Sequence, residues 1–114
     1  MTMRHASDAL FVYGSLLEEA TEILGHPVDV VPARLEGFER RHSRYHYIVR
    51  ADGAETGGLV MLDLTDEDWR RLDAYEEVPD LYTREEVEVD IYDGALRCWA
   101  YLPTAKCINL KAYI

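Results

Sequence analysis

The clearest structural signal in the chain is a nine-residue stretch near its start, ALFVYGSLL at residues 9–17. Its first five residues, Ala9–Tyr13, form an apolar run rich in strand-forming side chains, and the run breaks at Gly14-Ser15. A short apolar run that ends at a glycine is typical of a buried strand followed by a sharp turn. Apolar residues then recur at helical spacing up to Leu24, before Gly25. The stretch therefore predicts a strand, a turn and a helix in succession.

The rest of the chain predicts four or five more strands. Extended segments are expected at Val28–Gly37, Tyr45–Val49, Leu59–Leu64, Val87–Ile91 and Leu96–Leu102. The second of these is expected to end before Ala51-Asp52-Gly53, and Asp93-Gly94 is a strong two-residue hairpin signal. The residues after Pro103 show no clear period. With five or six strands and two helices, we expect an α+β fold whose mixed sheet is curled or barrel-like.

The second helix has a well-marked beginning at Thr65. Thr65 is expected to be the N-cap, and Asp68 takes the third helical position, where a capping box usually has Glu or Gln. Leu64 and Trp69 occupy the two positions of a hydrophobic staple. We expect this helix to end at about Tyr75, or two residues later.

Length and composition narrow the class of protein. A chain of 114 residues corresponds to one domain, residues 1–114. With 12 basic and 22 acidic residues, its net charge of −10 argues against binding to nucleic acid or to anionic lipid. Its apolar runs are too short to span a membrane, and two cysteines are too few for a disulfide framework. We expect a cytoplasmic protein.

Glu76 is the residue that most clearly suggests chemistry. At about 100° per residue, Glu76 falls within the apolar stripe made by Trp69 and Leu72, whereas Glu77 falls further toward solvent. Burial there would raise the pKa of the carboxyl group and suit it to general acid/base catalysis near neutral pH. The alternative is that the helix ends at Tyr75 and Glu76 turns out into water.

Three further features are weaker. A helix that starts directly after Gly14-Ser15 leaves backbone N–H groups free to bind an anion, although Ser15 is then equally well explained as a plain N-cap. His42 and His46 have the spacing of two zinc ligands on a helix, but their surroundings favour a strand and no third ligand is evident, so we expect no metal site. Cys98 alternates with core positions and is expected to be buried.

The order and spacing of several short motifs resemble the gamma-glutamyl cyclotransferase-like superfamily. The motifs are Tyr13-Gly14-Ser15-Leu16, Gly58-Leu59-Val60, residues 72–84 and Ala100-Tyr101. Residues 76–84 have the spacing acid-x-x-Pro-x-x-Tyr-x-Arg, which is most similar to the gamma-glutamylamine cyclotransferase branch. The resemblance covers about residues 9–102.

This resemblance implies a small β-barrel with flanking helices, and an enzyme that works without metal or cofactor. It implies a small-molecule γ-glutamyl substrate, whose α-amine attacks its own γ-carbonyl to give 5-oxoproline and a free amine or amino acid. Glu76 matches the general acid/base. Gly14, Ser15 and Leu16, with Tyr13 before them, match the loop that holds the substrate's α-carboxylate, and Tyr82 and Tyr101 match tyrosines of the pocket. Arg84 is expected to support the strand or the acid.

Two alternatives remain at this point. One is a related amide-cleaving lyase with another small carboxylate substrate. The other is a binding or interaction module that keeps the pocket without turnover. A second glutamate, Glu77, would be the acid if the helix register differed from the expected one.

Overall fold

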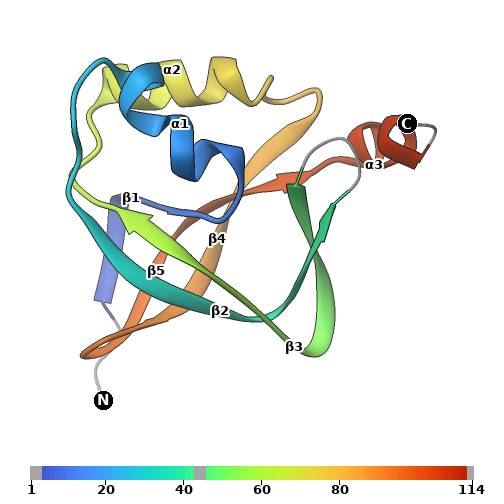
Figure 1. The fold of residues 1–114 in the computed structure, drawn as a ribbon, viewed down its shortest axis with the longest axis horizontal. Coiled ribbons are helices and arrows are strands. Elements are labelled where there is room, and N and C mark those ends of the chain that lie inside the picture. Colours follow the sequence, from blue (N-terminus) through green and yellow to red (C-terminus); the bar gives the residue numbers. More distant parts are fainter. Residues whose placement is uncertain (1–3, 43–45, 113–114) are drawn as a thin grey trace.

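A closed five-stranded barrel with three helices outside it forms the part of the chain that the computed structural model describes, residues 4–42 and 46–112 (Figure 1). The strands are β1 Arg4–Val12, β2 Val30–His42, β3 His46–Met61, β4 Tyr82–Ile91 and β5 Gly94–Pro103. The helices are α1 Ser15–Leu24, α2 Asp66–Tyr75 and α3 Ala105–Ala112. The expected α+β class, with a small barrel and flanking helices, is confirmed.

The order of the strands around the barrel is β1-β3-β2-β4-β5, and the barrel closes where β5 meets β1. This closing pair is parallel, with Phe11 beside Ala100, whereas the other pairs are antiparallel. The sheet is therefore mixed, as the sequence predicts. Because β1 and β5 run in the same direction, both strands finish at the same end of the barrel.

The strand β1 is apolar without interruption because both of its faces are covered. Phe11 packs inside the barrel with residues such as Leu35 and Val89. Leu10 and Val12 face the other way, into a second core beneath the helices. Figure 1 shows α1 and α2 lying side by side over this region. A strand buried on both faces reads as a continuous apolar run, which is what residues 9–13 display.

The helix termini follow the expected signals. At α2, Thr65 and Asp68 form a capping box, and the staple residues Leu64 and Trp69 are both buried. At the end of α1, Gly25 adopts a left-handed conformation with φ of 79°, which closes the helix and favours glycine. None of the described helices is long and apolar enough to cross a membrane.

Several sequence expectations are wrong in their details: β1 begins at Arg4 rather than Ala9 and β4 at Tyr82 rather than Val87, and further differences follow. The break expected at residues 51–53 does not occur, because β3 continues through them as one strand of 16 residues and Gly53 takes its positive φ inside it. The strand β2 likewise extends past Gly37 to His42, and β3 ends at Met61 rather than Leu64. Residues 105–112, which show no period, form α3. Tyr45 lies outside the described residues.

The break expected at residues 51–53 and the end of β2 expected at Gly37 are wrong for the same reason. The long hairpin of β2 and β3 bends at an irregularity in register between Glu36 and Phe38, and local turn signals at glycines mark this bend rather than a chain reversal.

Candidate functional site

The topology brings the ends of several elements together at one end of the barrel. Tyr13 follows β1, and Tyr101 lies near the end of β5, which is parallel to β1. Tyr82 begins β4, which is antiparallel to β5, so that Tyr82 stands opposite Pro103. The three tyrosines are therefore neighbours although they lie up to 88 residues apart, and all three are buried.

Glu76 lies at the C-terminus of α2 and is partly buried. The helix ends at Tyr75, but Glu76 keeps near-helical angles (φ −84°, ψ 0°) and its N–H donates to the carbonyl of Leu72 at 3.0 Å. Its side chain therefore stays on the side of Trp69 and Leu72 instead of turning out into water. Glu77 is exposed and has φ of 54°, so the chain changes direction there.

The negative charge of Glu76 raises the pKa of all three tyrosines. Burial raises the pKa of Tyr13, and the neighbouring carboxylate of Glu76 raises it further. The pKa of Tyr82 is raised by burial, then by Cys107 and by Glu76. For Tyr101, burial and its hydrogen bond to Asp73 raise the pKa, with a smaller contribution from Glu76. The three phenols therefore stay protonated near neutral pH, beside the carboxylate of Glu76 and, at Tyr101, that of Asp73.

The turn between β1 and α1 adjoins this group through Tyr13. Gly14 is the N-cap of α1 with φ of −130° and ψ of −138°, and as a glycine it has no side chain to cap the N–H groups of the first helical turn. Ser15 is the first helical residue, so the interpretation of Ser15 as the N-cap is wrong. Leu16 is buried, whereas the side chain of Ser15 lies outside what the structure describes. Backbone N–H groups at such a helix start favour anions.

A chain of polar contacts joins the tyrosines to α2 and β4. The hydroxyl of Tyr13 donates to the carbonyl of Tyr101 at 3.2 Å. The hydroxyl of Tyr101 donates to Oδ1 of Asp73 at 2.6 Å, and the other oxygen of Asp73 pairs with Arg84 at 3.2 Å. The guanidinium of Arg84 also lies over the ring of Trp69, 4.5 Å from its centroid. Arg84 therefore supports Asp73 and Tyr101.

Three residues that the sequence analysis did not assign to the site also contact it. Asp73 holds Tyr101, and its place about 60° from Glu76 on the helical wheel was a usable signal. Arg40 donates to the carbonyl of Tyr13 at 2.8 Å. Nothing in the sequence indicates that Arg40, rather than the neighbouring Arg41, makes this contact. Cys107 on α3 is buried beside Tyr82, so the tail after Pro103 covers this end of the barrel.

The two candidate metal ligands do not lie on a helix. His42 and His46 lie in β2 and β3 and pair across the hairpin, so the i, i+4 relation on a helix does not apply. Their side chains lie outside the described ones, among which no three His, Cys, Asp or Glu gather as a metal site. Cys98 is buried inside the barrel as expected, and burial raises the pKa of its thiol to about 12.

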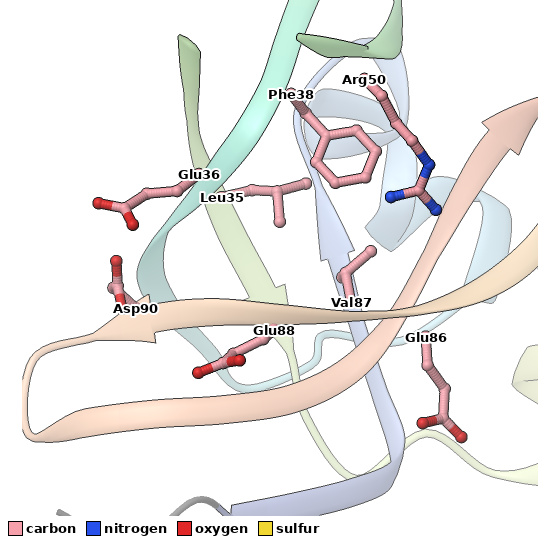
Figure 2. A pocket seen from close by; sticks show the side chains of 8 residues that line it. All are labelled: Leu35, Glu36, Phe38, Arg50, Glu86, Val87, Glu88 and Asp90. Atoms are coloured by element: carbon pink, nitrogen blue, oxygen red, sulfur yellow. The ribbon is translucent and has the colours of Figure 1, made fainter. Parts of the chain in front are cut away.

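A pocket of about 360 Å³ opens elsewhere, between β2 and β4, where these strands pair only near Arg34 and Asp90 (Figure 2). Its apolar base is Leu35, Phe38 and Val87, and its rim carries Glu36, Glu86, Glu88, Asp90 and Arg50. Four carboxylates against one guanidinium make it a poor site for a substrate carboxylate. None of the predicted site residues lines it.

Comparisons with known proteins agree with the fold and the motifs. The chain is 39% identical over 89 residues to AIG2-like protein C of Arabidopsis thaliana, with 74% of this chain and 51% of that protein covered. It is 27% identical over 90 residues to a gamma-glutamylcyclotransferase and putative RNase of Methanocaldococcus jannaschii, with 75% and 40% covered. The chain thus spans about half the length of the curated relatives it matches.

Among solved structures, one described as a gamma-glutamyl cyclotransferase superposes with a TM-score of 0.71 at 25% identity, over 84% of this chain and 66% of the other. The sequence profile of the family described as gamma-glutamyl cyclotransferase, AIG2-like, matches residues 10–113. That match spans the end of β1, the turn after it, the other four strands and the end of α2. The chain belongs to the gamma-glutamyl cyclotransferase, AIG2-like family.

Proposed function

We propose that the chain is a cyclotransferase that converts a γ-glutamyl amine or γ-glutamyl amino acid to 5-oxoproline and a free amine. The observation that carries this proposal is the position of Glu76, a partly buried carboxylate whose charge reaches Tyr13, beside the Gly14 turn. A general base and an anion-binding turn at one site match a substrate that carries an ammonium group and a carboxylate on the same carbon.

The turn after β1 holds the α-carboxylate of the substrate. The N–H groups of Gly14, Ser15 and Leu16 lie at the start of α1, where intrahelical acceptors are missing and the helix dipole favours negative charge. Backbone donors of this kind bind the carboxylate in a fixed orientation, and this orientation places the α-nitrogen near its own γ-carbonyl. Because both reacting groups belong to one molecule, positioning supplies much of the rate acceleration and no cofactor is needed.

Glu76 moves the proton. Its carboxylate takes a proton from the ammonium, and the neutral amine attacks the γ-carbonyl carbon. The new C–N bond closes the five-membered ring. Glu76 then returns this proton to the leaving nitrogen as the original γ-amide bond breaks, and it transfers the second proton that the attacking nitrogen must lose in the same way. The products are the lactam with one N–H, the leaving amine as its ammonium form, and the free carboxylate of Glu76.

The buried tyrosines form the wall around the ammonium. Tyr13 and Tyr101 each donate their hydroxyl proton to a protein acceptor, so toward the substrate's N–H groups each phenol oxygen acts only as an acceptor. Tyr82 stands beside them with a raised pKa and stays neutral. Neutral phenols of this kind add no further negative charge near Glu76, so the ammonium remains easy to deprotonate.

A substrate panel tests the proposal. Purified protein is incubated with γ-glutamyl amines and γ-glutamyl dipeptides, and 5-oxoproline is assayed, with Glu76→Gln protein as the blank for spontaneous cyclisation. We expect at least one compound to be turned over by the wild type well above the blank. Binding of γ-glutamyl compounds without any release of 5-oxoproline would instead identify a binding module, and cleavage to free glutamate would identify a hydrolytic relative.

A further inference from the structure

Arg40 is the side chain that ties the long hairpin of β2 and β3 to the turn after β1. Its Nη1 donates to the carbonyl oxygen of Tyr13 at 2.8 Å. Arg40 lies on β2 and Tyr13 directly follows β1, and these two strands are not neighbours because β3 separates them in the barrel. The contact is possible because the hairpin bends between Glu36 and Phe38.

A second contact holds the same residue. The hydroxyl of Tyr13 interacts with the backbone of Ile48, which pairs with Arg40 across the hairpin. The bent half of the hairpin therefore contacts Tyr13 at both its side chain and its carbonyl group.

The carbonyl of Tyr13 and the N–H of Gly14 belong to one peptide unit. This unit is planar and, in the trans form, the C=O and N–H bonds point in opposite directions. A guanidinium that fixes the Tyr13 carbonyl on one side therefore fixes the Gly14 N–H on the other. Gly14 has wide conformational freedom and no side-chain cap, so an external contact is an effective way to set this orientation.

We propose that Arg40 is a positioning residue that presets the Gly14 N–H for the substrate's carboxylate. This inference rests on the proposed function, since it assigns that N–H to the α-carboxylate. Arg40 acts through the peptide unit between Tyr13 and Gly14, and it has no part in the proton transfers at Glu76. Its loss therefore weakens carboxylate binding and leaves the chemical step nearly intact.

The chain offers a matched control in Arg41. It is the next residue on β2, so its side chain leaves the strand on the opposite face, and it pairs with Glu39 at 3.5 Å on the surface. Arg40→Met and Arg41→Met remove the same charge and the same donors while keeping a long side chain. A general effect of net charge would appear in both variants, whereas loss of the Tyr13 contact affects only the first.

Three readouts test the inference: steady-state kinetics, the dissociation constant of 5-oxoproline, and the amide signal of Gly14 in a ¹⁵N spectrum. For Arg40→Met we expect KM and the 5-oxoproline dissociation constant to rise about tenfold or more, the usual effect of losing a hydrogen bond to a charged group. We expect kcat to stay within about threefold and the Gly14 signal to move. Arg40→Lys should recover part of the affinity, and Arg41→Met should match the wild type in all three.

The readouts separate this inference from the proposed function. If the wild type releases no 5-oxoproline from any γ-glutamyl compound, the proposed function fails, while 5-oxoproline binding and the Gly14 signal still test Arg40. An unchanged Gly14 signal in Arg40→Met overturns the inference whatever the activity. It is overturned equally by unchanged affinity, by the absence of 5-oxoproline binding to the wild type, or by equal losses in Arg41→Met.

Discussion

Glu76 differs from Glu77 because of one change in backbone conformation. Glu76 keeps near-helical angles and a hydrogen bond to Leu72, so its side chain follows the buried stripe of α2. At Glu77 the backbone becomes left-handed, with φ of 54°, and the side chain is exposed. Two chemically identical neighbours therefore face different environments, and the proposed function gives a role in catalysis to Glu76 alone.

Glu76→Gln is expected to lower turnover by roughly 100- to 10,000-fold, the range that general acid/base catalysis contributes. The amide keeps the size of the side chain but carries no transferable proton. Substrate should still bind, since backbone N–H groups hold the carboxylate, and stability should hold or rise slightly because an amide is less costly to bury than a charge. Turnover of both glutamine variants on the best panel substrate is the measurement.

Glu77→Gln is the control and should cost little, because that side chain is exposed. If Glu77→Gln is the inactive variant and Glu76→Gln is normal, the roles of the two residues are reversed. Full activity in both variants would reject a glutamate base at this position.

The space around residue 58 leaves no room for a side chain, so only glycine fits there without a shift. A Cβ atom added there would lie 2.2 Å from the backbone oxygen of Val12 and about 3.0 Å from the ring of Phe11. The chain must therefore shift at the end of β1, directly before the candidate carboxylate-binding turn. Gly57, its neighbour, has nothing within 4 Å of such an atom.

Gly58→Ala should therefore destabilise the fold by about 1–3 kcal/mol, as overpacking commonly does. Gly57→Ala should change stability by much less. Chemical denaturation of the two variants beside the wild type measures the difference, and equal stabilities for both would contradict the close approach of β3 to β1.

At the scale of elements, the start of α2 is held by a pair that responds to pH. Asp68 is 3% exposed and accepts from His26 Nε2 at 2.7 Å, while the other ring nitrogen of His26 lies 2.8 Å from the carbonyl of Pro27. Both ring nitrogens face oxygen acceptors, so only the imidazolium satisfies both. The hydrogen bond to Asp68 accordingly raises the pKa of His26 above 6.5. Burial opposes ionisation of Asp68, but hydrogen bonds from Thr65 and His26 outweigh it and lower its pKa below 3.8.

The raised pKa of His26 and the lowered pKa of Asp68 together define the pH range in which this pair stabilises the fold. A histidine with a raised pKa contributes fully below pH 6.5, and this contribution is lost as the pH rises through the raised value. The carboxylate contributes above pH 3.8 and is lost as the pH falls through its lowered value. We expect His26→Ala to lower the free energy of unfolding more at pH 5.5 than at pH 8.

Denaturant unfolding at both pH values measures this effect. In an Asp68→Asn background, the difference between the costs of His26→Ala at pH 5.5 and pH 8 should be smaller, because the carboxylate that raises the pKa of His26 most is gone and only the hydrogen bond to Pro27 still raises it. A cost that is independent of pH in the wild-type background as well would show that the pair does not act as an ion pair.

At the scale of the whole molecule, barrel closure assembles the site. The parallel pairing of β1 with β5 brings Tyr13 and Tyr101 to one end, and the β4–β5 hairpin brings Tyr82 to the same end. The charge of Glu76, at the end of α2, reaches this group, and α3 covers it through Cys107. The proposed substrate site therefore needs the closed barrel together with the start of α1, the end of α2 and α3.

A property of the whole protein follows from this chemistry. Because the proposed reaction joins two groups of one substrate through a carboxylate, and no three metal-ligating side chains gather among the described ones, we expect no dependence on metal. Treatment with a chelator followed by dialysis should leave turnover and the melting temperature unchanged. Lost activity that returns with added zinc would contradict this expectation.

The sequence by itself determined those features whose signals are local. The strand, turn and helix of residues 9–24, the capping box at Thr65 and Asp68, and the hairpin of β4 and β5 each depend on neighbouring residues and could be predicted. The two residues of that hairpin's turn are Tyr92 and Asp93, one position before the predicted Asp93-Gly94, because Ile91 pairs with Gly94. The helical wheel also placed Glu76 on the apolar side of α2, because 3.6-residue periodicity persists to the last turn.

Only the tertiary structure decided which distant residues meet. A glycine signals a turn and a bend equally, so the continuity of β3 through Gly53 depends on pairing with β2 on either side of it and could not be predicted locally. The contact of Arg40 with Tyr13 arises from the bend in that hairpin, and Tyr101 meets Asp73 because the barrel closes. Contacts of this kind depend on the packing of whole elements, and no periodicity along the chain encodes them.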